Sequence, residues 1–276
     1  MSSIKRFIKK NFGQWIYRRQ LSPVRKKELI NWNRSLQDTM PRKLSDASFD
    51  VFTYHGEDGI LCHLLEKLGN VPNTFVDIGS GDCIKSNYAS LVVHFNWNGL
   101  FIDKNAAQLA VGRSFYRGII KGGADIKFIE ATITAQNVNE LIAQSIAGKK
   151  IGVLSIDIDG NDFWIWQAIS TIDPEIVVIE AKVEFGYRSI AVPEGPHNHA
   201  GIDPEYNGAS VEAFRKLGAM KGYKLAGANK QGYNLFFVKG SREIPAVTSA
   251  EVLNDKGTIN SFYKEEFFTS HQFMNI

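Results

Sequence analysis

Acidic residues stand at the ends of several short apolar runs in this sequence. Asp77, Asp103, Asp157 and Glu180 each end, or nearly end, a run rich in β-branched and aromatic residues, which suits a buried parallel strand. The carboxyl ends of parallel strands meet at one edge of a sheet, where ligands bind. We therefore expect these carboxylates to converge there, where they can bond hydroxyl groups, take up a proton or bind a cation.

The run that ends at Asp157 continues as Ser155-Ile-Asp-Ile-Asp-Gly-Asn-Asp162, with three acids within six residues. A turn into a helix needs one capping acid, and surplus carboxylates repel each other unless a cation or a substrate uses them. Asp157, Asp159 and Glu180 make a plausible oxygen-only Mg²⁺ site. Asp157, Glu180, His197 and His199 are the alternatives for a general base, and the sequence leaves base and metal both open.

A glycine turn follows the first of these acids. Asp77-Ile-Gly79-Ser80-Gly81 is the kind of turn where the backbone must come close to something. Asp103 lies 24 residues after Gly79, near the spacing at which an acid reaches a pair of ribose hydroxyls. A dinucleotide-binding fingerprint would need a further glycine at position 84, and Ile84 stands there.

The elements that must position these residues alternate regularly. Hydrophobic periodicity predicts five strand–helix units and then two closing strands. The predicted strands are 74–78, 99–103, 126–130, 151–157, 174–180, 223–226 and 234–238. The predicted helices are 60–68, 87–95, 105–115, 138–146, 163–169 and 209–221. This order predicts an α/β, Rossmann-like, mostly parallel seven-stranded sheet with an antiparallel last strand at its edge.

Two stretches fall outside that alternation. Residues 181–207 read as a long irregular segment whose polar and aromatic side chains suit a hydroxyl-bearing ligand. The aromatic-rich tail from Ser241 is expected to pack back on the body.

The N-terminal residues differ in charge from the rest of the chain. Residues 1–43 hold twelve Lys/Arg and two acids, a net +10, so the remainder carries −7 against a total of +3. Apolar residues at helical spacing predict a basic amphipathic helix, followed by a second helical stretch at 23–36. We expect a helical arm at 1–45 and one domain at 46–276. The arm can pack on its own domain or a sister subunit, contact an anionic membrane, or bind nucleic acid, the last being least expected.

Composition suits one large domain of 276 residues with 44% hydrophobic content. We expect a cytoplasmic chain, either free or at the inner membrane face, because there is no signal-peptide pattern and no run of about 18 apolar residues. Cys62 and Cys83 are expected to be buried and free.

Several motifs together resemble one family. The chain holds Tyr54-His-Gly-Glu-Asp-Gly, Phe75-Val-Asp-Ile-Gly, Gly99-Leu-Phe-Ile-Asp, Ser155-Ile-Asp-Ile-Asp-Gly-Asn-Asp, Val177-Val-Ile-Glu and Gly208-Ala-Ser. Over residues 49–239 this set resembles the class I S-adenosylmethionine (SAM) methyltransferases, and among them the FkbM-like branch. Two positions depart from that pattern: Asp159 replaces a glutamate, and His55 stands where an aromatic or amide residue is expected.

The resemblance implies SAM as methyl donor, with O-methylation of a sugar, nucleotide-linked sugar or glycan precursor in a surface-polysaccharide or natural-product pathway. The cofactor-binding residues expected on this basis are Tyr54, Glu57, Asp58, Asp77, Gly79, Ser80, Gly81, Asp103, Lys104 and Asp157. Mg²⁺ and a homo-oligomer are possible additions. The alternatives are a methyltransferase for a non-sugar small molecule, an NAD-binding oxidoreductase and a non-catalytic SAM-binding protein.

Overall fold

The computed structural model describes residues 43–120, 123–146, 148–195 and 205–276. The predicted arm at 1–45 therefore lies almost wholly outside the described residues. Its last residues enter a short 3-10 helix, η1 (Leu44–Ala47). This helix packs closely on the first long helix, since a Cβ on Gly59 would lie 2.2 Å from the Ala47 carbonyl oxygen.

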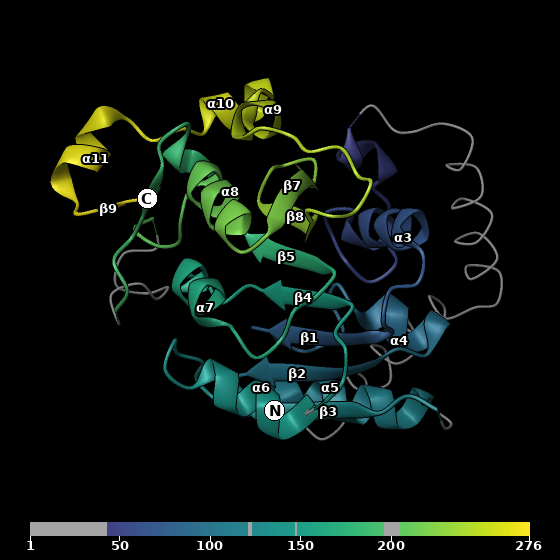
Figure 1. Ribbon diagram of the computed structural model, residues 1–276. Coiled ribbons are helices and arrows are strands. Elements are labelled where there is room, and N and C mark those ends of the chain that lie inside the picture. The colour runs from purple at the N-terminus through teal and green to yellow at the C-terminus, as the bar shows by residue number, and fades with distance from the viewer. Residues whose placement is uncertain (1–42, 121–122, 147, 196–204) are drawn as a thin grey trace, which may run out of the picture.

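A seven-stranded sheet forms the centre of the domain and confirms the predicted fold class. Its strands are β1 (Thr74–Ile78), β2 (Asn98–Asp103), β3 (Ile126–Glu130), β4 (Val153–Ile156), β5 (Ile176–Glu180), β7 (Tyr223–Ala228) and β8 (Asn234–Lys239). They lie in the order β3-β2-β1-β4-β5-β8-β7, stacked from bottom to top in Figure 1. β8 is the antiparallel strand, and it lies between β5 and β7 rather than at the predicted edge.

Helices cover both faces of the sheet. One core contains Val76, Ile78 and other side chains of that face, and the helices packed there are α6 (Val138–Ile146), α7 (Asp162–Ala168) and α8 (Val211–Met220). The other core contains Phe75 and Phe101, and its helices are α3 (Glu57–Leu68), α4 (Ala89–Phe95) and α5 (Ala106–Ile119). Successive residues of a strand point to opposite faces, so β1 supplies both cores and all five of its residues are buried.

The C-terminal segment packs back on the body, as predicted. Its elements are α9 (Ser249–Leu253), α10 (Lys256–Asn260), α11 (Glu265–Ser270) and β9 (Met274–Asn275). β9 pairs with β6 (Ile190–Ala191), which follows the 3-10 helix η2 (Val183–Phe185). Phe185, Ile190 and Val192 form a small separate core with five aromatic side chains, four of them from the C-terminal segment. The segment predicted as irregular thus contains two ordered elements, η2 and β6, before residues 196–204, which lie outside the described residues.

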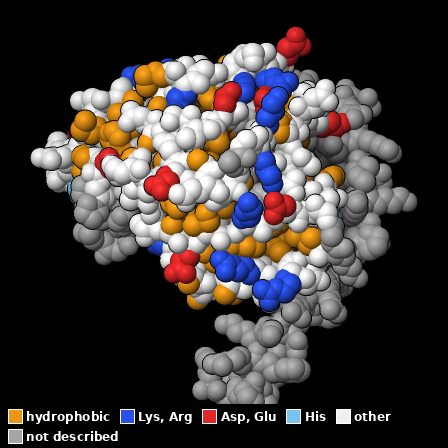
Figure 2. Space-filling view, turned by 60° about the horizontal axis from the view of Figure 1, so that its bottom comes forward, with side chains coloured by type: hydrophobic (Ala, Val, Ile, Leu, Met, Phe, Trp, Pro, Cys, Tyr) orange, Lys and Arg blue, Asp and Glu red, His pale blue; other side chains and the backbone are white. Residues whose placement is uncertain are grey.

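The surface carries mixed chemistry. On the face shown in Figure 2, hydrophobic side chains form several groups separated by Lys, Arg, Asp and Glu. Within the described residues, no helix has the length and apolar character needed to cross a membrane. Cys62 and Cys83 are buried and free, as expected.

One buried carboxylate organises the entrance to α3. Oδ2 of Asp58 accepts hydrogen bonds from the backbone N–H groups of Val51, Phe52 and Thr53, at 2.8, 2.8 and 2.9 Å. The hydroxyl of Thr53 also donates to this oxygen, at 3.0 Å. Asp58 therefore fixes the loop that leads from η1 to the sheet edge.

We expect Asp58→Ala to lower the free energy of unfolding by on the order of 3 kcal/mol, because the substitution leaves three buried N–H groups without an acceptor. Urea unfolding measures this change. The control is Lys67→Ala on the exposed side of the same helix, expected within about 0.5 kcal/mol of wild type. Equal stability of the two variants would contradict the role given to Asp58.

Candidate active site

The glycine turn after β1 permits an unusually close approach between two strand ends. Gly79 has φ +86°, and a Cβ at this position would lie 1.6 Å from the carbonyl oxygen of Asp157. The N–H groups of Gly79 and Ser80 donate to the Ile102 carbonyl at 2.9 and 3.2 Å. Only glycine fits at position 79, because any side chain would push the β1 and β4 ends apart.

Asp103 fixes the other side of this turn. Its Oδ2 accepts from the N–H of Gly81 at 2.8 Å, and its Oδ1 accepts from the N–H of Asn105 at 2.7 Å. The side chain of Asn105 in turn caps α5 by accepting from the N–H groups of Ala107 and Gln108. Each carboxylate oxygen keeps a lone pair for a further donor, so Asp103 can hold the turn and a ligand together.

Two cavities meet at this sheet edge, and both are lined by Gly79 and Asp157. The larger strand-end cavity has a volume of about 430 Å³. Its other lining residues are Gly81, Ile102, Asp103, Lys104, Asn105, Gln108, Ala131, Thr132, Ile133, Ile158, Asp159 and Glu180. The smaller strand-end cavity has a volume of about 150 Å³. Its other lining residues are Thr53, Tyr54, His55, Glu57, Asp77, Ser80, Lys85, Ser86, Asn87, Ser155 and Asn234.

Opposite charges line the smaller strand-end cavity. Asp77 is buried and accepts a hydrogen bond of 2.6 Å from the hydroxyl of Ser86. Burial raises the pKa of Asp77 to about 7, against a smaller opposing effect of that hydrogen bond. Lys85 supplies a positive charge, and its Nζ lies 5.2 Å from the ring centre of Tyr54, which is 65% exposed. This cavity therefore offers both a buried carboxyl group and a cation to a ligand.

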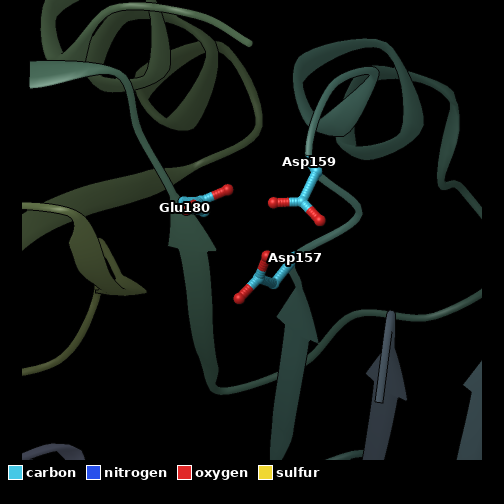
Figure 3. A group of neighbouring side chains, drawn as sticks. All are labelled: Asp157, Asp159 and Glu180. Carbon is cyan, nitrogen blue, oxygen red and sulfur yellow. The ribbon is translucent and has the colours of Figure 1, made fainter. Parts of the chain in front are cut away.

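Three carboxylates converge where the two cavities meet. Asp157 follows β4, Asp159 lies two residues further along the loop, and Glu180 ends β5 (Figure 3). One oxygen from each lies within 4.8 Å of one oxygen from each of the others. Asp159 has φ +56°, and Asp162 supports this turn by accepting from the N–H groups of Ile158 and Gly160 at 2.8 and 2.9 Å. Asp162 thus has a structural role in the motif. Asp157 and Asp159 point into the space that they share with Glu180.

Asp157 and Glu180 stay protonated at a higher pH than an isolated carboxyl group does. Asp157 reaches solvent through the cavities but lies deep among protein atoms, and the loss of hydration and then the charge of Glu180 raise its pKa well above the usual range. Burial, followed by the charges of Asp162 and Asp159, raises the pKa of Glu180 to about 8. The two interacting carboxyl groups therefore share at least one proton near neutral pH.

Most of the predicted site residues lie at these cavities. Tyr54, Glu57, Asp77, Gly79 and Ser80 line the smaller one, and Gly81, Asp103 and Lys104 line the larger. The Glu57 carboxylate is largely occupied, since Oε1 accepts from the side-chain amides of Asn229 and Asn234, each at 2.9 Å. Asp58 lies outside both cavities, where it holds the loop before α3. His197 and His199 lie outside the described residues.

Several lining residues were not predicted. Lys85, Ser86 and Asn87 follow the glycine turn and face the smaller strand-end cavity, while Thr132 and Ile133 line the larger one after β3. A lysine followed by two small polar residues, directly after a glycine turn, was the available signal for the first group. Asn234 lies 157 residues after Asp77 and carries no comparable local signal.

Comparisons with known proteins find likeness only among solved structures. No family model and no curated protein matches this chain. An O-methyltransferase family protein from Burkholderia thailandensis is 12% identical, with 66% of this chain matched to 57% of that chain and a TM-score of 0.39. The present chain thus spans less than two thirds of that protein.

Two further matches are enzymes by name. Magnesium protoporphyrin IX methyltransferase from Synechocystis PCC 6803, solved with bound S-adenosylhomocysteine, is 12% identical over 66% of this chain and 81% of its own, with a TM-score of 0.42. The cyclopropane synthase MmaA2 from Mycobacterium tuberculosis is 15% identical over 67% and 72%, with a TM-score of 0.41. The function of the present chain must be argued from its own site.

The raised pKa of Glu180 predicts a pH-dependent stability for the unliganded protein. Between the ordinary carboxyl pKa of 4.5 and about 8, the folded state binds a proton that the unfolded state has lost. Stability therefore falls as pH rises through this window. We expect Glu180→Gln to raise Tm above that of wild type by on the order of a few degrees at pH 8, with the difference shrinking toward pH 5.

Differential scanning fluorimetry over pH 5 to 8 measures this effect. The control is Glu265→Gln, because Glu265 is exposed and remote from the strand ends. A difference between Glu180→Gln and wild type that stays constant with pH would refute the account of the acid pair.

Proposed function

We propose that this protein is a SAM-dependent O-methyltransferase that acts on a hydroxyl group of a sugar, nucleotide-linked sugar or glycan precursor. The observation that carries the proposal is the meeting of the two strand-end cavities at Gly79 and Asp157, beside three converging carboxylates. Such an arrangement holds a cofactor across the end of β1 and puts acidic oxygens next to its middle.

The two cavities suit the two ends of SAM. The larger, at about 430 Å³, has Asp103 for the ribose hydroxyls and the apolar Ile133 beside it for the base. The smaller, at about 150 Å³, has Asp77 for the ammonium group and Lys85 for the carboxylate of the amino-acid end. A buried acid and a nearby cation together favour a zwitterion over a singly charged ligand. Gly79 and Asp157, which line both cavities, would then hold the middle of the cofactor.

Methyl transfer is an in-line displacement on a reactive group that the cofactor itself supplies, so the protein mainly orients the reactants. The hydroxyl of the acceptor becomes a good nucleophile only when its proton is removed. Asp157 and Glu180 are the groups that can accept that proton, because burial raises the pKa of both carboxyl groups, that of Glu180 to about 8. The proton leaves the acceptor oxygen as the oxygen–methyl bond forms and the carbon–sulfur bond breaks.

The same carboxylates also fit a divalent cation. Asp157, Asp159 and Glu180 would supply three hard oxygen ligands, which Mg²⁺ prefers. A bound Mg²⁺ would lower the pKa of a coordinated hydroxyl and would relieve the repulsion within the acid group.

The sugar acceptor rests on the resemblance to the FkbM-like branch and on the polar side chains near the acids. Tyr233 is 37% exposed, and burial, followed by the charges of Glu184 and Glu180, raises its pKa. Such a side chain suits hydroxyl-rich ligands.

We also propose a cytoplasmic protein, in keeping with two free cysteines. Calorimetry with SAM and with NAD separates this proposal from an oxidoreductase.

We expect Asp103→Ala to weaken SAM binding at least tenfold, because a charged partner of the ribose hydroxyls contributes about 1.5–3 kcal/mol. Glu130→Ala is the control, since Glu130 pairs with Asp103 in the sheet register but is exposed and outside both cavities. Asp103 also holds the glycine turn, so an analogue of SAM without the ribose hydroxyls completes a double-mutant cycle. An equal loss of affinity for SAM and for the analogue would show that Asp103 does not bind the ribose hydroxyls.

We expect Asp157→Asn to abolish turnover while SAM affinity stays within a few-fold of wild type. The assay follows release of S-adenosylhomocysteine with a panel of nucleotide-linked sugars. Chelator added to wild type distinguishes the two chemistries: loss restored by Mg²⁺ supports the cation, and indifference supports direct proton transfer. Full activity of Asp157→Asn would contradict both.

A further inference from the structure

A third cavity lies apart from the two strand-end cavities. The β7 cavity, of about 570 Å³, is enclosed by η1, α3, the end of β7 and the segment that leads into α9 and beyond. Leu64, Ala226 and Ala228 are buried in its wall, and Leu44, Ile244, Val247 and Val252 are half-buried around it. With a volume of about 570 Å³ and these apolar side chains in its wall, the cavity can take up a large side chain of a binding partner.

The position of η1 determines where the N-terminal arm leaves the domain. Gly227 lies so close to Leu44 that a Cβ there would be 2.7 Å from the Leu44 Cβ, which holds η1 against β7. Lys43, the first described residue, lines the cavity, and its Nζ lies 3.4 Å from the side-chain oxygen of Asn254. The arm therefore joins the domain at the rim of the cavity.

The sequence next to that rim matches the cavity in chemistry. Residues 23–36 carry Leu29, Ile30 and Trp32 together with Arg25, Lys26, Lys27 and Arg34. The cavity lining also contains three carboxylates, those of Asp46, Glu251 and Asp255, and two cations, those of Lys43 and Lys230. The apolar side chains of the segment suit the apolar part of the wall, and its cations suit the three acids.

Chain length permits the contact at little cost in entropy. Six residues separate Leu36 from Lys43, and an extended chain spans about 3.3–3.6 Å per residue. The segment 23–36 is therefore held at a high effective concentration beside the cavity. A large aromatic side chain that enters a pocket is the usual centre of such an interface.

We propose that the β7 cavity binds residues 23–36 of the same chain, with Trp32 as the anchoring side chain. This contact covers apolar surface on both partners and connects the basic arm to the domain. It does not depend on the proposed methyl transfer.

Limited trypsin digestion of the full-length protein tests the proposal, because the segment contains four cleavage sites between Arg25 and Arg34. We expect these sites to be cut at least tenfold more slowly in wild type than in Trp32→Ala. Trp15→Ala is the matched control and should keep the protection. Val247→Asp, which puts a charge into the cavity wall, should remove it.

Three results would overturn the proposal. The first is rapid cleavage of wild type at Arg25–Arg34 in the absence of lipid, and the second is protection that survives both Trp32→Ala and Val247→Asp. The third is protection that disappears on dilution, which would assign the cavity to the arm of a second copy. Protection that appears only with anionic vesicles falls under the first result and would assign the segment to a membrane surface. Trp32→Ala changes no residue of the described domain, so it keeps the test decisive if Val247→Asp fails to fold.

Discussion

The contact between Gly79 and the carbonyl oxygen of Asp157 is the constraint on which the site depends. It brings the ends of β1 and β4 close enough for one ligand to touch both, and it requires a residue without a side chain. The parallel arrangement of the strands places Asp77, Asp103, Asp157 and Glu180 at one edge. The glycine turn then divides the space at that edge into two cavities of different size and polarity, so one backbone contact sets the layout of the whole site.

The converging acids lower the stability of the unliganded protein. Burial and repulsion from neighbouring acids oppose ionisation of Asp157 and Glu180. Burial also raises the pKa of Asp162, but its carboxylate accepts from the N–H groups of Ile158 and Gly160 and so supports the loop that carries Asp159. One oxygen of Asp58 accepts from three backbone N–H groups and holds the loop before α3. Carboxylates of the same chemical type thus differ in what they contribute to folding, because backbone N–H donors offset the cost of burial for Asp58 and Asp162.

The sequence predicted the sheet and the strand-end acids because both depend on local patterns. Apolar runs identify β1 and β4, and a parallel sheet brings the acids that follow them together. The sequence did not place β8 inside the sheet, because the residues of the hairpin do not show whether β7 or β8 pairs with β5. It also did not distinguish Asp58 from Asp77, because a carboxylate that accepts three N–H groups looks the same in sequence as one that faces a cavity. Asn234 was missed because only tertiary structure brings it to Glu57.

The hydrogen bonds between Glu57 and the β7–β8 hairpin have a consequence for biosynthesis. Asn229 and Asn234 hold this carboxylate from positions 172 and 177 residues further along the chain. A chain emerging from the ribosome has therefore made β1, β4 and the converging acids long before the residue that fixes Glu57 exists. The wall of the smaller strand-end cavity is completed only when the hairpin joins β5. A nascent chain that lacks the hairpin has the acids but an unfinished pocket, so ligand-assisted folding can begin only late in synthesis.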